Sequence, residues 1–336
     1  MKKSAFFGFL FSAILWSCTN GDSLENGIDP SANTDDWVVP TTEIRGGGET
    51  FGLMNTPKFK SVQETTSLQD TSKVTLVSFN NEVRVYPYHY TNFFEVVNDV
   101  FDGKNIAVSF CPITNSAICF DRTIDTKTYD FVASGYLYKY NMVPADKNLD
   151  FFYSQMLMTG IKGEYANTQL NQYNLVETVW GTVRQYFPNA KVFYHNETKS
   201  TKQGKSDDIK PVEDGDYYYG VLNSVKGEKQ VDLYAYEDFS EPINAVIKII
   251  NQQNAILIGS ESKRIFATYY IPENKTLTLL SDAEFPNVLT DNTGTIYSIF
   301  GYAVSGPDQG SQLESPQSIV AQHWAWKDFY PKLVYQ

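Results

Sequence analysis

The sequence predicts an α+β fold that is rich in β-structure, with two tandem structural repeats packed about a pseudo-twofold axis. Strand-like runs outnumber helix-like segments, and most connections between them have the length of hairpins. Two stretches of the chain also match each other at nearly constant spacing. The 336 residues suffice for two units of roughly 150 residues, and a hydrophobic content of 42% can fill a packed core.

The internal match joins segments of similar sequence whose separation drifts by only a few residues, as small loop insertions would produce. The matched pairs are Val83–Tyr86 with Val231–Tyr234, Ile106–Phe110 with Ala255–Gly259, and Trp180 with Trp324. We therefore expect repeat one over residues 50–194, a polar linker over 195–218 and repeat two over 219–336.

The elements of the first repeat follow from its apolar pattern. A helix is expected over 92–101, where Phe93, Val96, Val97 and Val100 recur at helical spacing. A second helix is expected near 178–187. The expected strands of this repeat are 74–79, 83–86, 106–110, 117–121 and 191–193.

The first eighteen residues have the pattern of a bacterial lipoprotein signal. A basic start, Met1-Lys2-Lys3, precedes an apolar run that is too short to span a bilayer. Cys18 follows a Leu-x-Ser stretch that resembles a lipobox, so we expect residues 1–17 to be removed and Cys18 to carry palmitate or a related acyl chain. An ordinary signal peptide with an incidental Cys18 is the alternative.

Residues 18–49 are expected to form a flexible acidic tether, because they carry many Asp and Glu side chains, Pro and a triple-Gly run but few apolar residues. The lipid would then be the contact with the membrane. The body would lie in the cell envelope, on the periplasmic side or at the cell surface.

Charge and motif content exclude several classes of function. A net charge of −12 opposes binding to nucleic acid. Three Cys and three His are too few for a disulfide scaffold or a zinc-finger array. The sequence has no phosphate loop, dinucleotide fingerprint or Gly-x-Ser-x-Gly elbow, and it identifies no cofactor.

Several motifs occur together and in order along the chain. They include Arg84-Val85-Tyr86-Pro87, Glu95-Val96-Val97-Asn98-Asp99, Cys111-Pro112-Ile113-Thr114-Asn115-Ser116-Ala117 and Trp324-Ala325-Trp326. Over about residues 43–336 the chain resembles an uncharacterised bacterial family, domain of unknown function 3179 (DUF3179). The resemblance implies an extracytoplasmic location and no established activity. Members usually carry His where this chain has Phe94, so no site that uses that His is implied here.

Cys111 is the sharpest candidate for chemistry. It ends an apolar strand and is followed by Pro112, so its thiol stands at a strand exit, where neighbouring N–H groups can favour the thiolate. The matching place in the second repeat holds Ser260. A reactive thiol, a soft Cu(I) ligand and a small buried core residue all fit this position.

Three polar residues are the candidate partners of Cys111. Glu95 and Asn98 share one face of the expected helix, and Thr114 follows Cys111 in the loop. They would orient a substrate or assist proton transfer. The plainer alternative is that Asn98 and its neighbour Asp99 satisfy backbone groups at the end of the helix.

The other candidates have plain structural alternatives. Cys119 would either pair with Cys111 in a disulfide, if the intervening segment forms a hairpin, or pack in the core. Arg84 and Arg122 would hold an anion or, as we favour, form structural ion pairs. The histidines His89, His195 and His323 lack metal-ligand spacing, and we expect packing or surface roles for them.

The aromatic content is high, with 23 Tyr, 22 Phe and 5 Trp. These rings would stack on sugars or, more plainly, cover half-buried sheet faces.

Two functions remain. The favoured one is a binding or interaction module with a cleft near Cys111, for a small molecule or an envelope protein. The alternative is a thiol-dependent enzyme or Cu(I) carrier that uses Cys111.

Overall fold

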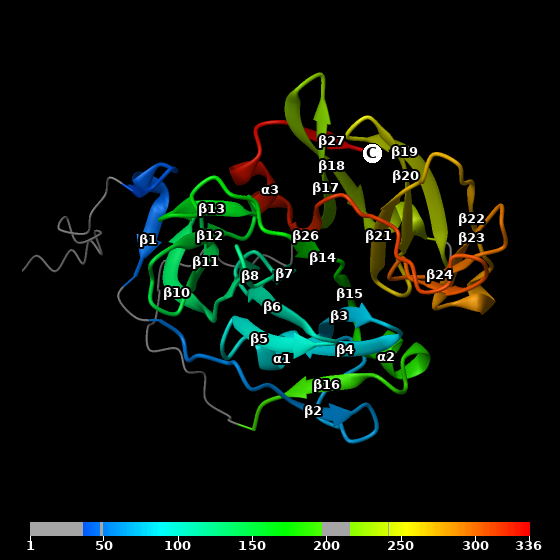
Figure 1. Cartoon of the computed structure of the whole chain (residues 1–336), viewed down its shortest axis with the longest axis horizontal. Helices are drawn as coiled ribbons and strands as arrows, with labels where there is room; N and C mark the ends of the chain where they lie inside the picture. The colour runs from blue at the N-terminus through cyan, green and yellow to red at the C-terminus, as the bar shows by residue number, and fades with distance from the viewer. Residues whose placement is uncertain (1–35, 48–49, 197–215, 241) are drawn as a thin grey trace, which may run out of the picture.

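A computed structural model describes residues 36–47, 50–196, 216–240 and 242–336. About half of the residues are in strands and a tenth in helices, and six small sheets are arranged as the blades of a β-propeller (Figure 1). The prediction of an α+β fold with two repeats about a twofold axis is therefore wrong. The short aromatic-rich runs pair as hairpins within sheets of three to five strands, so the chain forms many small layers and few helices.

The expected signal peptide 1–17, the acylated Cys18 and most of the expected tether and linker lie outside the described residues. The described part of the expected tether, residues 36–47, contains strand β1 (Ile44–Gly46), which pairs with strand β10 (Phe131–Tyr138). Trp37 of this segment packs edge-on against Tyr136.

The first blade has the strand order β15-β3-β4-β16-β2. The helix α2 connects β15 to β16, and it confirms the helix expected near 178–187. The elements of this blade are β2 (Lys58–Ser61), β3 (Lys73–Phe79), β4 (Glu82–Pro87), β15 (Val176–Val179), α2 (Trp180–Tyr186) and β16 (Lys191–Tyr194).

The second blade has the strand order β14-β7-β6-β5. It contains the segment 92–101, where a turn and a strand stand in place of the expected helix. A four-residue helix, α1 (Tyr88–Thr91), is followed by a turn in which Glu95 has a φ of 58°, and residues 96–101 then form a strand. Valines at 96, 97 and 100 suit a strand better than a helix, because their β-branched side chains lose rotamer freedom in a helix. The strands are β5 (Val96–Phe101), β6 (Lys104–Cys111), β7 (Ser116–Asp121) and β14 (Gln172–Tyr173).

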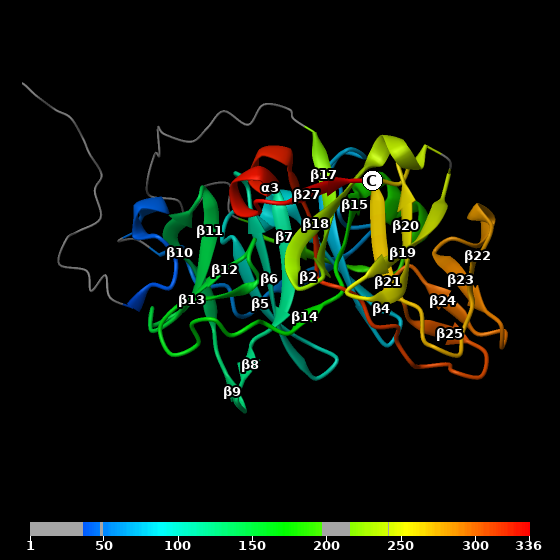
Figure 2. The ribbon, with the colours of Figure 1, turned by 90° about the horizontal axis from the view of Figure 1, so that it is seen from above.

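The third blade has the order β1-β10-β11-β12-β13. A small hairpin of β8 (Thr123–Ile124) and β9 (Lys127–Thr128) projects beside it, as Figure 2 shows. Its strands are β1 (Ile44–Gly46), β10 (Phe131–Tyr138), β11 (Asn141–Asp146), β12 (Phe152–Ser154) and β13 (Thr159–Lys162).

The remaining three blades come from the second half of the chain, with orders β26-β17-β18-β27, β19-β20-β21 and β22-β23-β24-β25. The fourth consists of β17 (Tyr217–Val225), β18 (Glu228–Ala235), β26 (Ser318–Gln322), α3 (His323–Phe329) and β27 (Leu333–Tyr335). The fifth consists of β19 (Asn244–Ile250), β20 (Gln253–Ser260) and β21 (Ile265–Tyr270). The sixth consists of β22 (Leu277–Leu279), β23 (Asn287–Asp291), β24 (Ile296–Ser298) and β25 (Ala303–Ser305).

The first and fourth blades share one connection pattern. In each, a central hairpin has an antiparallel strand on one side and, after a short helix, a parallel strand on the other. The matched segments 83–86 and 231–234 lie in β4 and β18, the second strands of these two hairpins.

Two hydrophobic cores cross from one half of the chain to the other. In the first, Phe131 and Met142 of the third blade lie with Ile319 and Trp326 of the fourth. In the second, Val85 of the first blade lies with residues of the fifth and sixth. The two halves of the chain therefore share cores, and each supplies apolar surface that the other buries.

Candidate functional site

Cys111 ends β6 and pairs with Ser116 across the tight turn of the β6–β7 hairpin. Asn115 closes that turn in the left-handed region, at a φ of 49°. Cys119 lies opposite Val108, so the two thiols sit at different levels of the ladder. Because side chains alternate between the faces of a strand, Cys111 and Cys119 enter different cores. Both thiols are free and buried, and no disulfide joins them.

The thiol of Cys111 is enclosed, and two of the three polar residues predicted beside it, Thr114 and Glu95, lie near it. The backbone N–H of Met142 donates to Sγ at 3.3 Å, and the Thr114 hydroxyl hydrogen-bonds the same sulfur. Burial, with a smaller contribution from the nearby Glu95 carboxylate, raises the pKa of the Cys111 thiol. The thiol therefore stays protonated at neutral pH, whereas a nucleophile or metal ligand needs the thiolate.

A buried polar cluster that sequence reasoning missed adjoins this turn. The amide of Gln155 donates to the Ser109 hydroxyl at 3.0 Å and accepts from Ser116 at 2.7 Å. Asn141 donates to Thr114 at 2.8 Å and to Gln155 at 2.9 Å. These side chains come from β6, the β6–β7 turn, β7, β11 and the segment after β12, and no local pattern in the sequence links segments so far apart.

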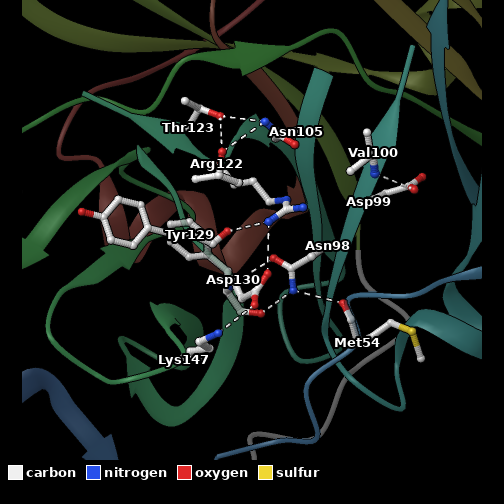
Figure 3. Close-up of polar contacts among 12 residues, drawn as sticks. Met54, Asn98, Asp99, Val100, Asn105, Arg122, Thr123, Tyr129, Asp130 and Lys147 are labelled. Atoms are coloured by element: carbon white, nitrogen blue, oxygen red, sulfur yellow. Dashed lines mark hydrogen bonds and ion pairs between the residues drawn. The ribbon is translucent and has the colours of Figure 1, made fainter. Parts of the chain in front are cut away.

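Asn98 lies in another part of the second blade and has a structural role (Figure 3). Its amide donates to the carbonyl groups of Phe131, at 2.7 Å, and Met54, at 3.0 Å, and accepts from the Phe131 N–H at 2.7 Å. The neighbouring Asp99 accepts from the Tyr86 hydroxyl at 2.6 Å and pairs with Arg84. Asn98 thus joins blades, as its place in β5 requires, instead of facing Cys111.

The two arginines form structural ion pairs. The guanidinium of Arg122 donates to the Tyr129 carbonyl at 2.9 Å and to Asp130 at 3.1 Å, and Lys147 reaches the same carboxylate at 3.0 Å (Figure 3). Arg84 contacts Asp99 and lies over the Phe101 ring at 4.2 Å. These contacts use the charges internally, which favours the structural interpretation over anion binding.

The histidines are far apart in the fold. His89 is exposed. The rings of His195 and Phe94 pack edge to face with their centroids 4.7 Å apart, and His323 hydrogen-bonds the Tyr335 hydroxyl at 2.7 Å. Among the residues that the structure describes, no three His, Cys, Asp or Glu side chains gather as metal ligands.

A cavity of about 1320 Å³ lies among the described residues, and five of the six blades line it. Ala117 and Cys119 of β7 lie in its wall, whereas Cys111 at the end of β6 does not line it. Two linking segments, residues 167–176 and 315–318, supply much of the lining. Ligand sites in proteins commonly measure roughly 300–1,000 Å³. This cavity exceeds that range, so it can hold a ligand of several rings.

The chemistry of the wall is polar but almost uncharged. Nine of its 32 residues are Asn or Gln, and five are Tyr. Among the described residues that line it, Lys229 is the single Lys, Arg, Asp, Glu or His. Since 20% of the whole chain is charged, about six such residues would be expected in a random sample of this size. The lining is therefore depleted in charge.

Six blades, five of which line a polar cavity, define a β-propeller protein with a candidate ligand site between its blades. The family model described as protein of unknown function (DUF3179) matches residues 52–333, and the chain belongs to this family. No curated protein and no solved structure gives a significant match. In the part of the chain that the structure describes, none of the helices is long and apolar enough to cross a membrane.

Proposed function

We propose that the protein is a lipid-anchored binding module of the cell envelope and that its ligand occupies the cavity between the blades. The observation that carries the proposal is the cavity itself, with a volume of about 1320 Å³ and a wall of amide and tyrosine side chains. A large concave site with polar groups that converge on it is the usual setting for ligand binding.

The anchor rests on the sequence alone, where Cys18 follows the apolar signal and a Leu-x-Ser stretch. Labelling with radioactive palmitate in the producing cell checks it. Incorporation that is lost in Cys18→Ser supports the anchor, and incorporation that persists in that variant contradicts it.

The alternative, a thiol-dependent enzyme or Cu(I) carrier, is supported by the nearness of Glu95 and Thr114 to Cys111. It is opposed by the complete burial of Cys111 and by the raised pKa of its thiol. In addition, Cys111 does not line the cavity, whereas Cys119 does.

Thermal unfolding of the protein with a panel of small ligands separates the two functions. The panel contains amino acids, short peptides, nucleotides, neutral and anionic oligosaccharides, and Cu(I) held by a weak chelator. We expect at least one organic ligand to raise the melting temperature equally in wild type and in Cys111→Ser, because that thiol does not line the cavity. Stabilisation that disappears in Cys111→Ser, or that only Cu(I) produces, would favour the alternative.

A further inference from the structure

We infer that the ligand of this cavity is a neutral oligosaccharide held by the rings of Tyr173 and Tyr270, an inference that rests on the proposed function. The first observation is the low charge of the cavity wall. Lys229, which is exposed, is the one charged residue of the wall in the described chain. An anionic ligand would find a single partner and a cationic ligand none, and an unpaired charge is costly to remove from water.

The amide side chains select for hydroxyl groups. Each Asn or Gln offers both donors and an acceptor, and each sugar hydroxyl does the same. Nine such residues line the cavity. A purely apolar ligand would cover these amides without replacing their hydrogen bonds to water. Each amide group left unpaired would then weaken the binding free energy.

The nitrogen of one of these amides has no hydrogen-bond partner in the part of the chain that the structure describes. Gln172 lies on β14 at the wall, and its Nε2 is enclosed without a hydrogen-bond partner among the described residues. Enclosed polar atoms in native proteins normally have a partner. Since Nε2 itself is enclosed, the Gln172 amide must rotate toward the cavity before a ligand hydroxyl or a water there can supply the partner.

Tyr173 and Tyr270 supply the stacking surfaces, since both are only half-buried. The Tyr173 hydroxyl donates to Asp121 at 3.0 Å, and the Tyr270 hydroxyl accepts from Asn251 at 2.8 Å. These bonds hold the rings before a ligand arrives, which reduces the entropy lost on binding. Fixed aromatic faces flanked by amides match the apolar faces and hydroxyl edges of a sugar chain.

A peptide is the nearest competitor, because it too carries neutral polar groups. Peptides are commonly held along an exposed strand edge, with apolar pockets for alternate side chains. The edge strand β14 at this wall has two residues, Gln172 and Tyr173, which allow few ladder hydrogen bonds. The observations therefore favour the sugar.

Calorimetric titration with tetrasaccharides tests the inference. The probes are neutral malto-, cello- and chito-tetraose, anionic tetragalacturonate, and an uncharged blocked tetrapeptide. We expect at least one neutral tetrasaccharide to bind. Tyr173→Ala and Tyr270→Ala should each weaken its binding about tenfold, whereas Tyr173→Phe and Tyr270→Phe, which keep the ring, should stay within about threefold of wild type.

An exposed position gives a variant that does not disturb the core. Asn171 lines the cavity and is exposed, so Asn171→Trp should obstruct it, while Asn148→Trp, at an exposed turn away from it, should bind as wild type does. Tight binding of the anionic probe or the peptide, blocked by Asn171→Trp, would overturn the sugar and leave the proposed cavity site standing. Sugar binding that survives Asn171→Trp and both Ala variants would overturn both.

Discussion

Asn98 joins two blades through three hydrogen bonds from one side chain. Two of them satisfy the N–H and carbonyl of Phe131 in β10, and the third reaches Met54 in the segment that runs beside β5. Asn98 itself has no exposed surface. Its removal would leave backbone groups buried without partners, and this cost exceeds the mean net value of a hydrogen bond.

Asn98→Ala is therefore expected to lower the free energy of unfolding by about 2–3 kcal/mol without changing ligand binding. Denaturant unfolding and the ligand panel measure the two quantities. Asn148→Ala, at an exposed turn, is the control and should cost less than about 0.5 kcal/mol. A variant of full stability that fails to bind would place Asn98 in the functional site and contradict its structural role.

At this scale the sequence predicted two neighbours of Cys111, a residue that does not line the cavity. Residues within one turn could be grouped, so Cys111 and Thr114 were linked correctly, and Glu95 does lie near the thiol. The partners of Asn98 could not be read, because Phe131 is 33 residues away and offers only backbone atoms. Asn141 and Gln155 were missed for the same reason.

Single elements were predictable where the chain carries unambiguous local signals. The helix near 178–187 was found, and α2 spans Trp180–Tyr186. Instead of the helix expected over 92–101, a turn leads into a strand over 96–101, because a spacing of apolar residues that suits a helix also suits a buried strand with both faces covered. The burial of both Val96 and Val97 in β5 illustrates this ambiguity.

The turn that follows β23 depends on one carboxylate. Asp291 accepts from the N–H groups of Thr293, at 2.9 Å, and Thr295, at 3.0 Å, and it also pairs with Lys275. Burial opposes ionisation, but these hydrogen bonds, led by that of Lys275, outweigh it and lower the pKa of Asp291. The turn is thus stabilised by the charged form of the side chain.

A lowered pKa fixes the sign of the pH dependence. The stabilisation from Asp291 is complete above the unfolded-state pKa of about 3.9 and is lost as the pH falls toward the lower folded-state pKa. Asp291→Asn should cost about 1.5–3 kcal/mol at pH 7, and the difference from wild type should shrink below about pH 4. Denaturant unfolding from pH 2 to 7 measures it.

A partner variant separates this charge from its surroundings. Asp308 also pairs with Lys275 but is more exposed, so Asp308→Asn should cost less at pH 7 because solvent screens its charge. If the cost of Asp291→Asn were the same at pH 2 and pH 7, the carboxylate charge would not be the source of the stabilisation.

The whole molecule could be predicted only in composition, as a β-rich chain with a large core. Its arrangement in six blades depends on contacts between distant segments, such as those that place Trp326 in one core with Phe131. The cavity was missed for the same reason. Its wall combines Tyr173 and Gln317 with Tyr270, residues that no short motif connects.

Hydrogen exchange of the backbone amides, measured with and without the panel compound that most stabilises the protein, tests the account most directly. Binding in the cavity should slow exchange in residues 167–176 and 315–318, the two segments that supply much of its wall. Slowing confined to the turn at 112–115, or to outer strands such as β5 and β19, would place the ligand elsewhere and contradict the central claim.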